Sequence, residues 1–230
     1  MFGGNVNRAL EITQAEYIAI HHSDDIWIPN KLEKQVEFLD QNKAVGAVFS
    51  NALIIDENGE NFNNENHFHF TIFNQKNRSR QEWLRYFFLN ANSLCHPSVL
   101  IRKQCYIDCG AYRHGFGQLA DFDMWVRLAL KYEIHIIPEK LIKFRLRDNE
   151  ANSSANNLEN QSRMFYEFSL ILDNYSKIDC INELIRVFPE ASKFCNGDSP
   201  DIRYALAMSI IELKPFNFSI QYALKILFDL

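Results

Sequence analysis

Apolar and polar positions alternate in two different ways along the chain. Short apolar runs rich in β-branched residues predict strands. Residues spaced three and four apart on one apolar face predict helices. The predicted strands are 15–21, 44–55, 98–102 and 134–146. The predicted helices of the same region are 81–89, 121–132 and the segment after Pro29, whose apolar stripe is Leu32, Val36 and Leu39.

From Gln161 onward the pattern is helical only, over 165–172, 181–188, 202–213 and 220–227. This change of period predicts two units: an α/β domain over 1–155 and an all-α extension over 156–230. The polar segment 147–160, rich in Asn and Ser, is the predicted boundary loop. Asp56 to Gly59 predicts a turn, and the Asn-rich stretch 60–78 predicts a loop or an edge hairpin.

Composition narrows the class of protein. The chain has 230 residues, 47% of them hydrophobic and 23% charged, which is typical of a globular protein and excludes a disordered or collagen-like chain. The net charge of -5 argues against nucleic acid as a partner. Five cysteines without a secretory signal predict reduced thiols in a cytosol, buried as small hydrophobic side chains. No apolar run approaches the length needed to cross a bilayer.

A first acidic cluster, His22-Ser23-Asp24-Asp25, follows a predicted buried strand. Residues two apart in an extended segment point to the same side, so His22 and Asp24 can converge on one ligand. Such ligands suit a divalent cation that also holds phosphate oxygens. The alternative is a turn whose aspartates cap the following helix.

A second acidic pair, Asp121 and Asp123, opens a predicted helix after a glycine-bearing loop. The helix dipole favours carboxylates there, and one could cap the helix while the other serves as a general base. The alternative is that both only cap. Together the two clusters offer the metal site and the base that an in-line displacement at a sugar carbon needs. His67 and His69 have a ligand-like i, i+2 spacing, but they lie in a polar loop without a partner carboxylate pattern. His96 and His114 are better placed for a pocket, but they have no diagnostic spacing.

The residues themselves resemble a known family. The stretch 15–41 (AEYIAIHHSDDIWIPNKLEKQVEFLDQ) looks like the middle of the family 2 glycosyltransferases, which have a GT-A fold. The similarity covers roughly residues 3–155. It continues through 44–60, 97–102, 121–128 (DFDMWVRL) and 137–145. The resemblance therefore implies an α/β fold, a partial, Rossmann-like GT-A domain, followed by the all-α extension.

The resemblance also implies a reaction and a partner set. A sugar would pass, with inversion, from a UDP- or dTDP-sugar to a hydroxyl of a saccharide or lipid-linked acceptor. The expected setting is bacterial surface polysaccharide or glycolipid synthesis in the cytoplasm, with peripheral attachment to the inner face of the membrane left open.

The family's motifs assign roles to particular positions. Asp24 matches the second aspartate of the metal-binding motif, and His22 stands in place of the first; a divalent ion, Mn²⁺ or Mg²⁺, is implied. Asp25 belongs to the same donor-binding segment. Asp121 matches the catalytic base, while Asp123 matches a structural carboxylate. Arg147 stands where the family often has a histidine and would bind the donor diphosphate.

The sequence also departs from the family pattern. The family's two opening strands are missing, and the chain starts at the helix that residues 3–10 resemble. We therefore expect either a fragment or a partner, through self-association or another chain, that supplies the missing half. The rival hypothesis is a catalytically inactive module for binding or assembly. A metal-dependent hydrolase needs more ligands than the sequence offers.

Overall fold

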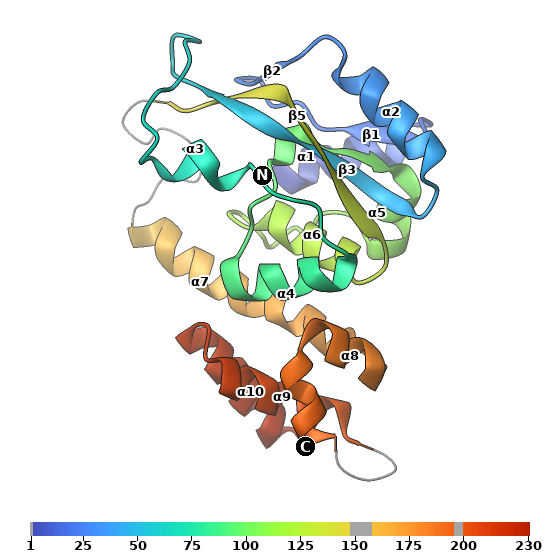
Figure 1. Ribbon diagram of the computed structural model, residues 1–230, viewed down its shortest axis with the longest axis vertical. Helices are drawn as coiled ribbons and strands as arrows, with labels where there is room; N and C mark the ends of the chain where they lie inside the picture. The colour runs from blue at the N-terminus through green and yellow to red at the C-terminus, as the bar shows by residue number, and fades with distance from the viewer. Residues whose placement is uncertain (1, 148–157, 196–199) are drawn as a thin grey trace.

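The computed structural model describes residues 2–147, 158–195 and 200–230. Within these ranges a mixed α/β part is followed by a layer of helices (Figure 1). The α/β part contains α1 (Phe2–Ile12), β1 (Tyr17–Ala19), β2 (Ile26–Trp27), α2 (Lys31–Gln41), β3 (Val45–Ile55), α3 (Phe68–Ile72), α4 (Arg80–Asn90), η1 (His96–Ser98), β4 (Leu100–Arg102), α5 (Lys103–Cys109), α6 (Ala120–Ala129) and β5 (Glu133–Arg145). The helical part contains α7 (Leu158–Leu172), η3 (Asp173–Lys177), α8 (Ile181–Val187), η4 (Pro189–Phe194), α9 (Ile202–Leu213) and α10 (Asn217–Phe228). The predicted boundary near residue 155 lies outside the described residues.

The strands form one sheet in the order β1-β4-β3-β5-β2. Its centre is the long parallel pair β3 and β5, and the other pairings are antiparallel. Side chains of β3 alternate between two apolar layers. Phe49 meets Trp125 of α6 edge to face, with ring centroids 4.9 Å apart. Val48 packs with Leu39 of α2 on the opposite face. Because both faces of β3 are covered, its sequence is almost continuously apolar rather than alternating.

Helix α2 lies where the sequence predicts a helix, and of the predicted buried stripe Leu39 is fully buried and Val36 half-buried, but Leu32 is not buried. Leu32 is 40% exposed, whereas Lys31 and Gln35 are fully buried. The amine of Lys31 donates to Gln35 Oε1 at 2.8 Å, and Gln35 Nε2 donates to the carbonyl of Ser98 at 2.8 Å. A polar pair that satisfies itself and the backbone can replace apolar residues in the interface, which periodicity alone does not reveal.

The stretch 60–78 also differs from its prediction. It contains helix α3 and a single bridge between Asn61 and Ile55, not a hairpin. His67 caps α3, because its ring accepts the backbone N–H of His69 at 3.3 Å. The turn before this stretch is as predicted, with Gly59 at φ +90°, a conformation that favours glycine.

The helical part packs directly on α4 and α6. Phe88 of α4 contacts Tyr175 and Phe188, with ring centroids 5.2 and 4.9 Å apart. Phe122 of α6 contacts Phe168 of α7 at 5.3 Å. These side chains belong to one hydrophobic cluster that crosses the two parts. None of the helices in the described residues has the length and apolar character of a membrane span.

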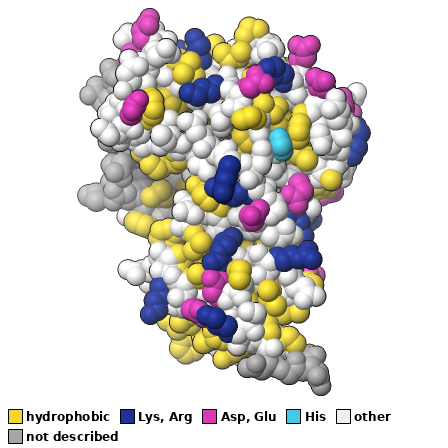
Figure 2. Space-filling model, in the orientation of Figure 1, with side chains coloured by type: hydrophobic (Ala, Val, Ile, Leu, Met, Phe, Trp, Pro, Cys, Tyr) yellow, Lys and Arg dark blue, Asp and Glu magenta, His cyan; other side chains and the backbone are white. Residues whose placement is uncertain are grey.

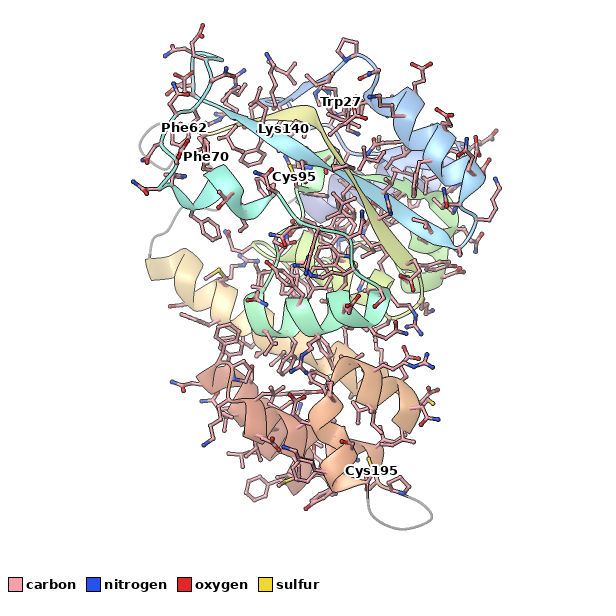
Figure 3. The ribbon with its side chains drawn as sticks, in the orientation of Figure 1. Trp27, Phe62, Phe70, Cys95, Lys140 and Cys195 are labelled. Carbon is pink, nitrogen blue, oxygen red and sulfur yellow. The ribbon has the colours of Figure 1, made fainter. Side chains whose placement is uncertain are left out.

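The surface and the cysteines complete the description. Apolar side chains gather on the lower part of the face shown in Figure 2. Phe228 of α10 is 88% exposed. Cys95 lies near the β3–β5 pair, and Cys195 lies at the far end of the helical part (Figure 3). All five cysteines are free. The prediction that they are buried is right for Cys95 and Cys105 but wrong for Cys180, which is exposed just before α8.

Candidate functional site

The first acidic cluster forms a compact group at the end of β1. One ligand atom each of His22, Asp24 and Asp25 lies within 4.8 Å of the other two. The segment is a turn, not the extended strand expected: the N–H of Asp25 donates to the carbonyl of His22 at 3.4 Å. The turn therefore brings Asp25 beside His22, with Asp25 Oδ2 3.6 Å from His22 Nδ1.

Arg145, at the end of β5, fixes this turn. Its backbone N–H donates to Asp25 Oδ1 at 2.9 Å, and its Nε donates to the carbonyl of Asp24 at 2.8 Å. Its Nη1 also donates to the carbonyls of Asp56 and Glu57. The sequence analysis assigned no role to Arg145, because its contacts with Asp24 and Asp25 join positions about 120 residues apart. The register that pairs β3 with β5 places Arg145 there.

Burial shifts the pKa values of two residues of the first cluster, Asp25 and His22. Asp25 is 6% exposed, and burial raises the pKa of its carboxyl to about 6. Burial lowers the pKa of His22, which keeps its imidazole neutral near pH 7. Asp24 pairs with the half-exposed Arg147, whose Nε lies 3.2 Å from Asp24 Oδ2. The structure thus places all four predicted donor-binding residues together.

Asp121 occupies the second position of α6. Its Oδ1 accepts the N–H of Phe122 at 2.8 Å, and its Oδ2 accepts from Asn92 Nδ2 at 2.9 Å. Burial raises the pKa of Asp121 to about 6, against the lowering effect of these hydrogen bonds. The sequence analysis missed Asn92, which lies in the loop after α4 and carries no motif.

Asp123 has a different environment two residues later. It is fully buried and lies 2.8 Å from Arg127 Nη2 and 3.0 Å from Arg113 Nη1. Asn174 of η3 also donates to it at 3.1 Å. These contacts tie α6 to the loop before it and to the helical part, and they leave Asp121 as the carboxylate of the pair without a cationic partner among the described residues.

His96 lies between the first acidic cluster and α6, the helix that carries the second. Its buried ring meets the His22 ring at 5.1 Å and the Trp125 ring of α6 at 5.6 Å. His96 Nε2 lies 3.0 Å from the Tyr112 hydroxyl. Burial lowers the pKa of His96 to about 3, so the ring stays neutral. The neighbouring Cys95 thiol has a pKa raised by burial, and the charges of Asp25 and Asp121 both raise it further. The clusters therefore flank the segment 95–96.

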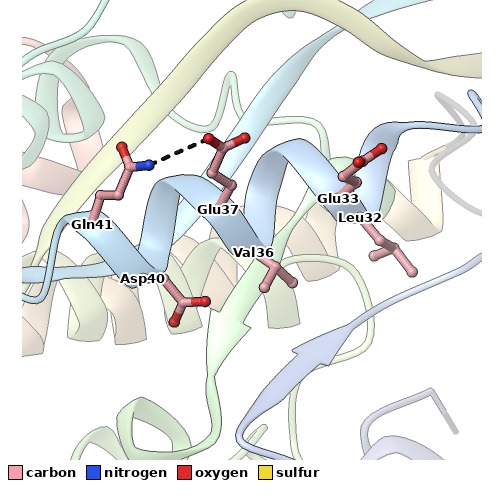
Figure 4. Close-up of a pocket in the computed structure, with 6 residues that line it drawn as sticks. All are labelled: Leu32, Glu33, Val36, Glu37, Asp40 and Gln41. Carbon is pink, nitrogen blue, oxygen red and sulfur yellow. Dashed lines mark hydrogen bonds between the residues drawn. The ribbon is translucent and has the colours of Figure 1, made fainter.

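The other candidates lie apart from this group. His67 and His69 stack on each other at 5.5 Å and pack with aromatic rings near α3. His114 is exposed in the loop before α6. A depression on the exposed face of α2 is shown in Figure 4, with Gln41 donating to Glu37 at 3.3 Å. Its lining includes Leu32, Val36 and Asp40, and none of its lining residues belongs to the candidate site.

Comparisons with known proteins agree with the geometry. Residues 1–104 match the model of glycosyl transferase family 2. An uncharacterized glycosyltransferase of Methanocaldococcus jannaschii is 33% identical over 150 residues, which are 64% of this chain and 48% of that protein. An amylovoran biosynthesis glycosyltransferase of Erwinia amylovora is 27% identical over 153 residues, which are 65% of this chain and 52% of that protein. The chain thus spans about half the length of these curated relatives.

Solved structures show the same fold. The crystal structure of a fragment of TarS from S. aureus superposes with a TM-score of 0.55 at 13% identity, covering 96% of this chain and 60% of that one. The chain is thus similar to the family 2 glycosyltransferases, and its α/β part has the GT-A type of fold.

Proposed function

We propose that this chain, as a relative of the family 2 glycosyltransferases, transfers a sugar from a nucleotide diphosphate donor to an acceptor hydroxyl with inversion. The observation that carries the proposal is that His96 packs against His22 of the first cluster and against Trp125 of α6, the helix that also carries Asp121. One cluster offers cation ligands, and the other offers a carboxylate with raised proton affinity. The donor we propose is a UDP- or dTDP-sugar, and the acceptor is a saccharide or a lipid-linked saccharide of a surface polysaccharide or glycolipid.

The first cluster fits a divalent cation. Asp25 Oδ2 is buried and accepts no hydrogen bond within the described residues, so one ligand oxygen is already aimed at the centre of the group. His22, Asp24 and Asp25 would hold the ion. A neutral imidazole among carboxylates favours Mn²⁺ over Mg²⁺. When bound, such an ion would neutralise charge on the leaving diphosphate.

The chain's own cations support the same role. Arg147 lies at the Asp24 carboxylate and would add positive charge for the diphosphate. Arg145 keeps the turn in place through its backbone and side chain. Both contacts depend on where β5 ends.

Asp121 is the proposed general base. A pKa of about 6 leaves it ionised at pH 7, yet it binds a proton more strongly than an ordinary aspartate. Asn92 and the N–H of Phe122 hold the carboxylate oxygens, and so they fix its direction. Asp121 would take the proton of the acceptor hydroxyl as that oxygen attacks the sugar carbon.

The rival is an inactive module for binding or assembly. The ion pair between Arg147 and Asp24 favours it, because a guanidinium already neutralises the carboxylate that a metal would use. The two functions differ in their response to metal: only the transferase requires a metal-dependent donor site.

Thermal unfolding tests the proposal. UDP, dTDP and GDP would each be added with and without Mn²⁺ to the wild-type chain and to Asp24→Ala. A ligand at a hundred times its Kd stabilises a fold by about 2.7 kcal/mol, which raises the Tm of a chain of this size by about 5–10 °C. We expect a rise that needs both nucleotide and Mn²⁺ and that disappears in Asp24→Ala. The matched control Asp179→Ala, which removes an exposed carboxylate of the helical part, should retain the rise. No rise with any nucleotide would refute the donor site.

A further inference from the structure

The loop that leads to Asp121 is held by one side chain of α7. Three successive backbone N–H groups donate to the carboxylate of Glu167, at 2.6 Å from Gly117, 2.9 Å from Gln118 and 2.7 Å from Leu119. Glu167 is 2% exposed. The loop has no regular secondary structure of its own, so this carboxylate satisfies N–H groups that no helix or strand does.

Arg163, one turn earlier on α7, completes the anchor. Its Nε lies 2.7 Å from Glu167 Oε1, and its Nη2 donates to the carbonyl of Gly115 at 3.2 Å. A Cβ at Gly117 would lie 2.4 Å from Arg163 Cζ, so the guanidinium fills the space that a larger residue would need. Burial would raise the pKa of Glu167, but Arg163 and the loop N–H groups outweigh it and hold that pKa below its usual value.

The anchor acts on the start of α6. Leu119 is the residue at the N-cap: its N–H donates to Glu167, and its carbonyl accepts the N–H of Asp123 at 2.9 Å. Asp121 lies between these two points. Beside the anchor, Phe168 of α7 contacts Phe122 of α6. The position of the Asp121 carboxylate therefore depends on a residue in the helical part, outside the segment 1–104 that matches the family.

We propose that Glu167 is a positioning residue for sugar transfer: it fixes the loop 115–119 and thereby the direction of the Asp121 carboxylate. This proposal rests on the proposed function of Asp121 as base. It makes the helical part a working component of the active site, since the α/β part alone would leave the N–H groups of the loop without their acceptor. A displacement of about 1 Å at a catalytic group can cost about 10²-fold in rate.

The test compares Glu167→Gln with Glu190→Gln in the full chain. Glutamine offers one acceptor oxygen and turns an NH₂ toward the loop donors, so the anchor is broken with little change in shape. Glu190 is the matched control: through Arg85 it also joins the helical part to the α/β part, but it does not touch the loop. The activity probe is the release of UDP or dTDP from UDP-glucose, UDP-N-acetylglucosamine and dTDP-rhamnose with Mn²⁺. The structural probe is amide hydrogen exchange of the loop.

We expect Glu167→Gln to lose exchange protection at Gly117, Gln118 and Leu119 and to lower kcat about 10–100-fold, with the donor KM within threefold of the wild type. Glu190→Gln should keep kcat within twofold. Unchanged protection in Glu167→Gln, unchanged kcat, or an equal loss in both glutamate variants would overturn the proposal. A wild-type chain that never releases nucleotide would instead refute the proposed function, and the exchange data would still show whether Glu167 holds the loop.

Discussion

Two aspartates that are two residues apart in α6 should respond to the same substitution with opposite signs. Asp121 is a carboxylate that burial disfavours, whereas Asp123 is a buried carboxylate paired with two arginines. We expect Asp121→Asn to stabilise the fold at pH 8 and to abolish transfer. We expect Asp123→Asn to destabilise it. Opposite signs would show that Asp121 has a catalytic role and Asp123 a structural one.

The magnitude for Asp121 follows from its pKa of about 6, against an ordinary value of 3.8. A difference of about two pKa units corresponds to about 3 kcal/mol by which the fold disfavours the ionised form. Solvent screens part of this free energy, because Asp121 is only half-buried by surface area. Asparagine also has one acceptor oxygen fewer, and the hydrogen bond lost reduces the gain further. A net gain of about 1–2 kcal/mol in the free energy of unfolding remains.

The pH dependence follows from the same values. The folded-state pKa of Asp121 lies above the unfolded value, so its ionisation costs stability above about pH 6 and costs nothing below about pH 4. The advantage of Asp121→Asn should therefore be complete at pH 8 and absent near pH 4. For Asp123→Asn, the loss leaves Arg127, which is 5% exposed, without its carboxylate, at a cost of about 3–5 kcal/mol.

Urea unfolding followed by tryptophan fluorescence at pH 8 and at pH 4 measures both effects. A lower urea midpoint for Asp121→Asn than for the wild type at pH 8 would refute the conclusion that the fold disfavours the ionised form of Asp121. A loss of less than about 1 kcal/mol in the free energy of unfolding of Asp123→Asn would refute the structural role of the Asp123 network.

Three further outcomes are expected elsewhere in the fold. Gly46→Ala should destabilise the protein by about 1–3 kcal/mol in urea unfolding, because the added Cβ would lie 2.7 Å from Tyr132 Cβ. Gly4→Ala is the control and should be neutral, because its Cβ would meet nothing within 4 Å. The ring of His96 should show no titration by NMR between pH 8 and 5 while the protein stays folded; a midpoint near 6.5 would contradict its burial. Burial lowers the pKa of Lys31 to about 7. The free energy of unfolding of the wild type should therefore rise, relative to that of Lys31→Met, by about 1 kcal/mol per pH unit from pH 7 to 9. Parallel curves of stability against pH for the two proteins would contradict this prediction.

The sequence predicted the central elements because their patterns are local. The run at β3, the strand at β5 and the helix that begins near Asp121 each have their own composition and period. The resemblance to a family assigned both acidic clusters to one site. In the structure, His96 packs against His22 of the first cluster and against α6, which carries the second. Local patterns also explain why the helical part was recognised as helical.

The remaining features depend on distant pairs. The buried face of α2 is polar because Lys31 and Gln35 satisfy each other, which an apolar template cannot anticipate. Arg145 reaches Asp24 and Asp25 across about 120 residues. Glu167 reaches the loop before Asp121 across about 50 residues. Such contacts follow from packing, and a single sequence carries no signal for them.

Two measurements on Asp121→Asn test most directly whether the two clusters form one transfer site. The first is the turnover of nucleotide sugar, and the second is the affinity for UDP in the presence of Mn²⁺. We expect release of UDP or dTDP to fall at least about 100-fold, in line with the usual contribution of a general base. The Kd for UDP with Mn²⁺ should stay within threefold of the wild type, because the ligands of the cation are untouched. Turnover equal to that of the wild type, or a parallel loss of turnover and nucleotide binding, would contradict the assignment of Asp121 as the base of a separate donor site.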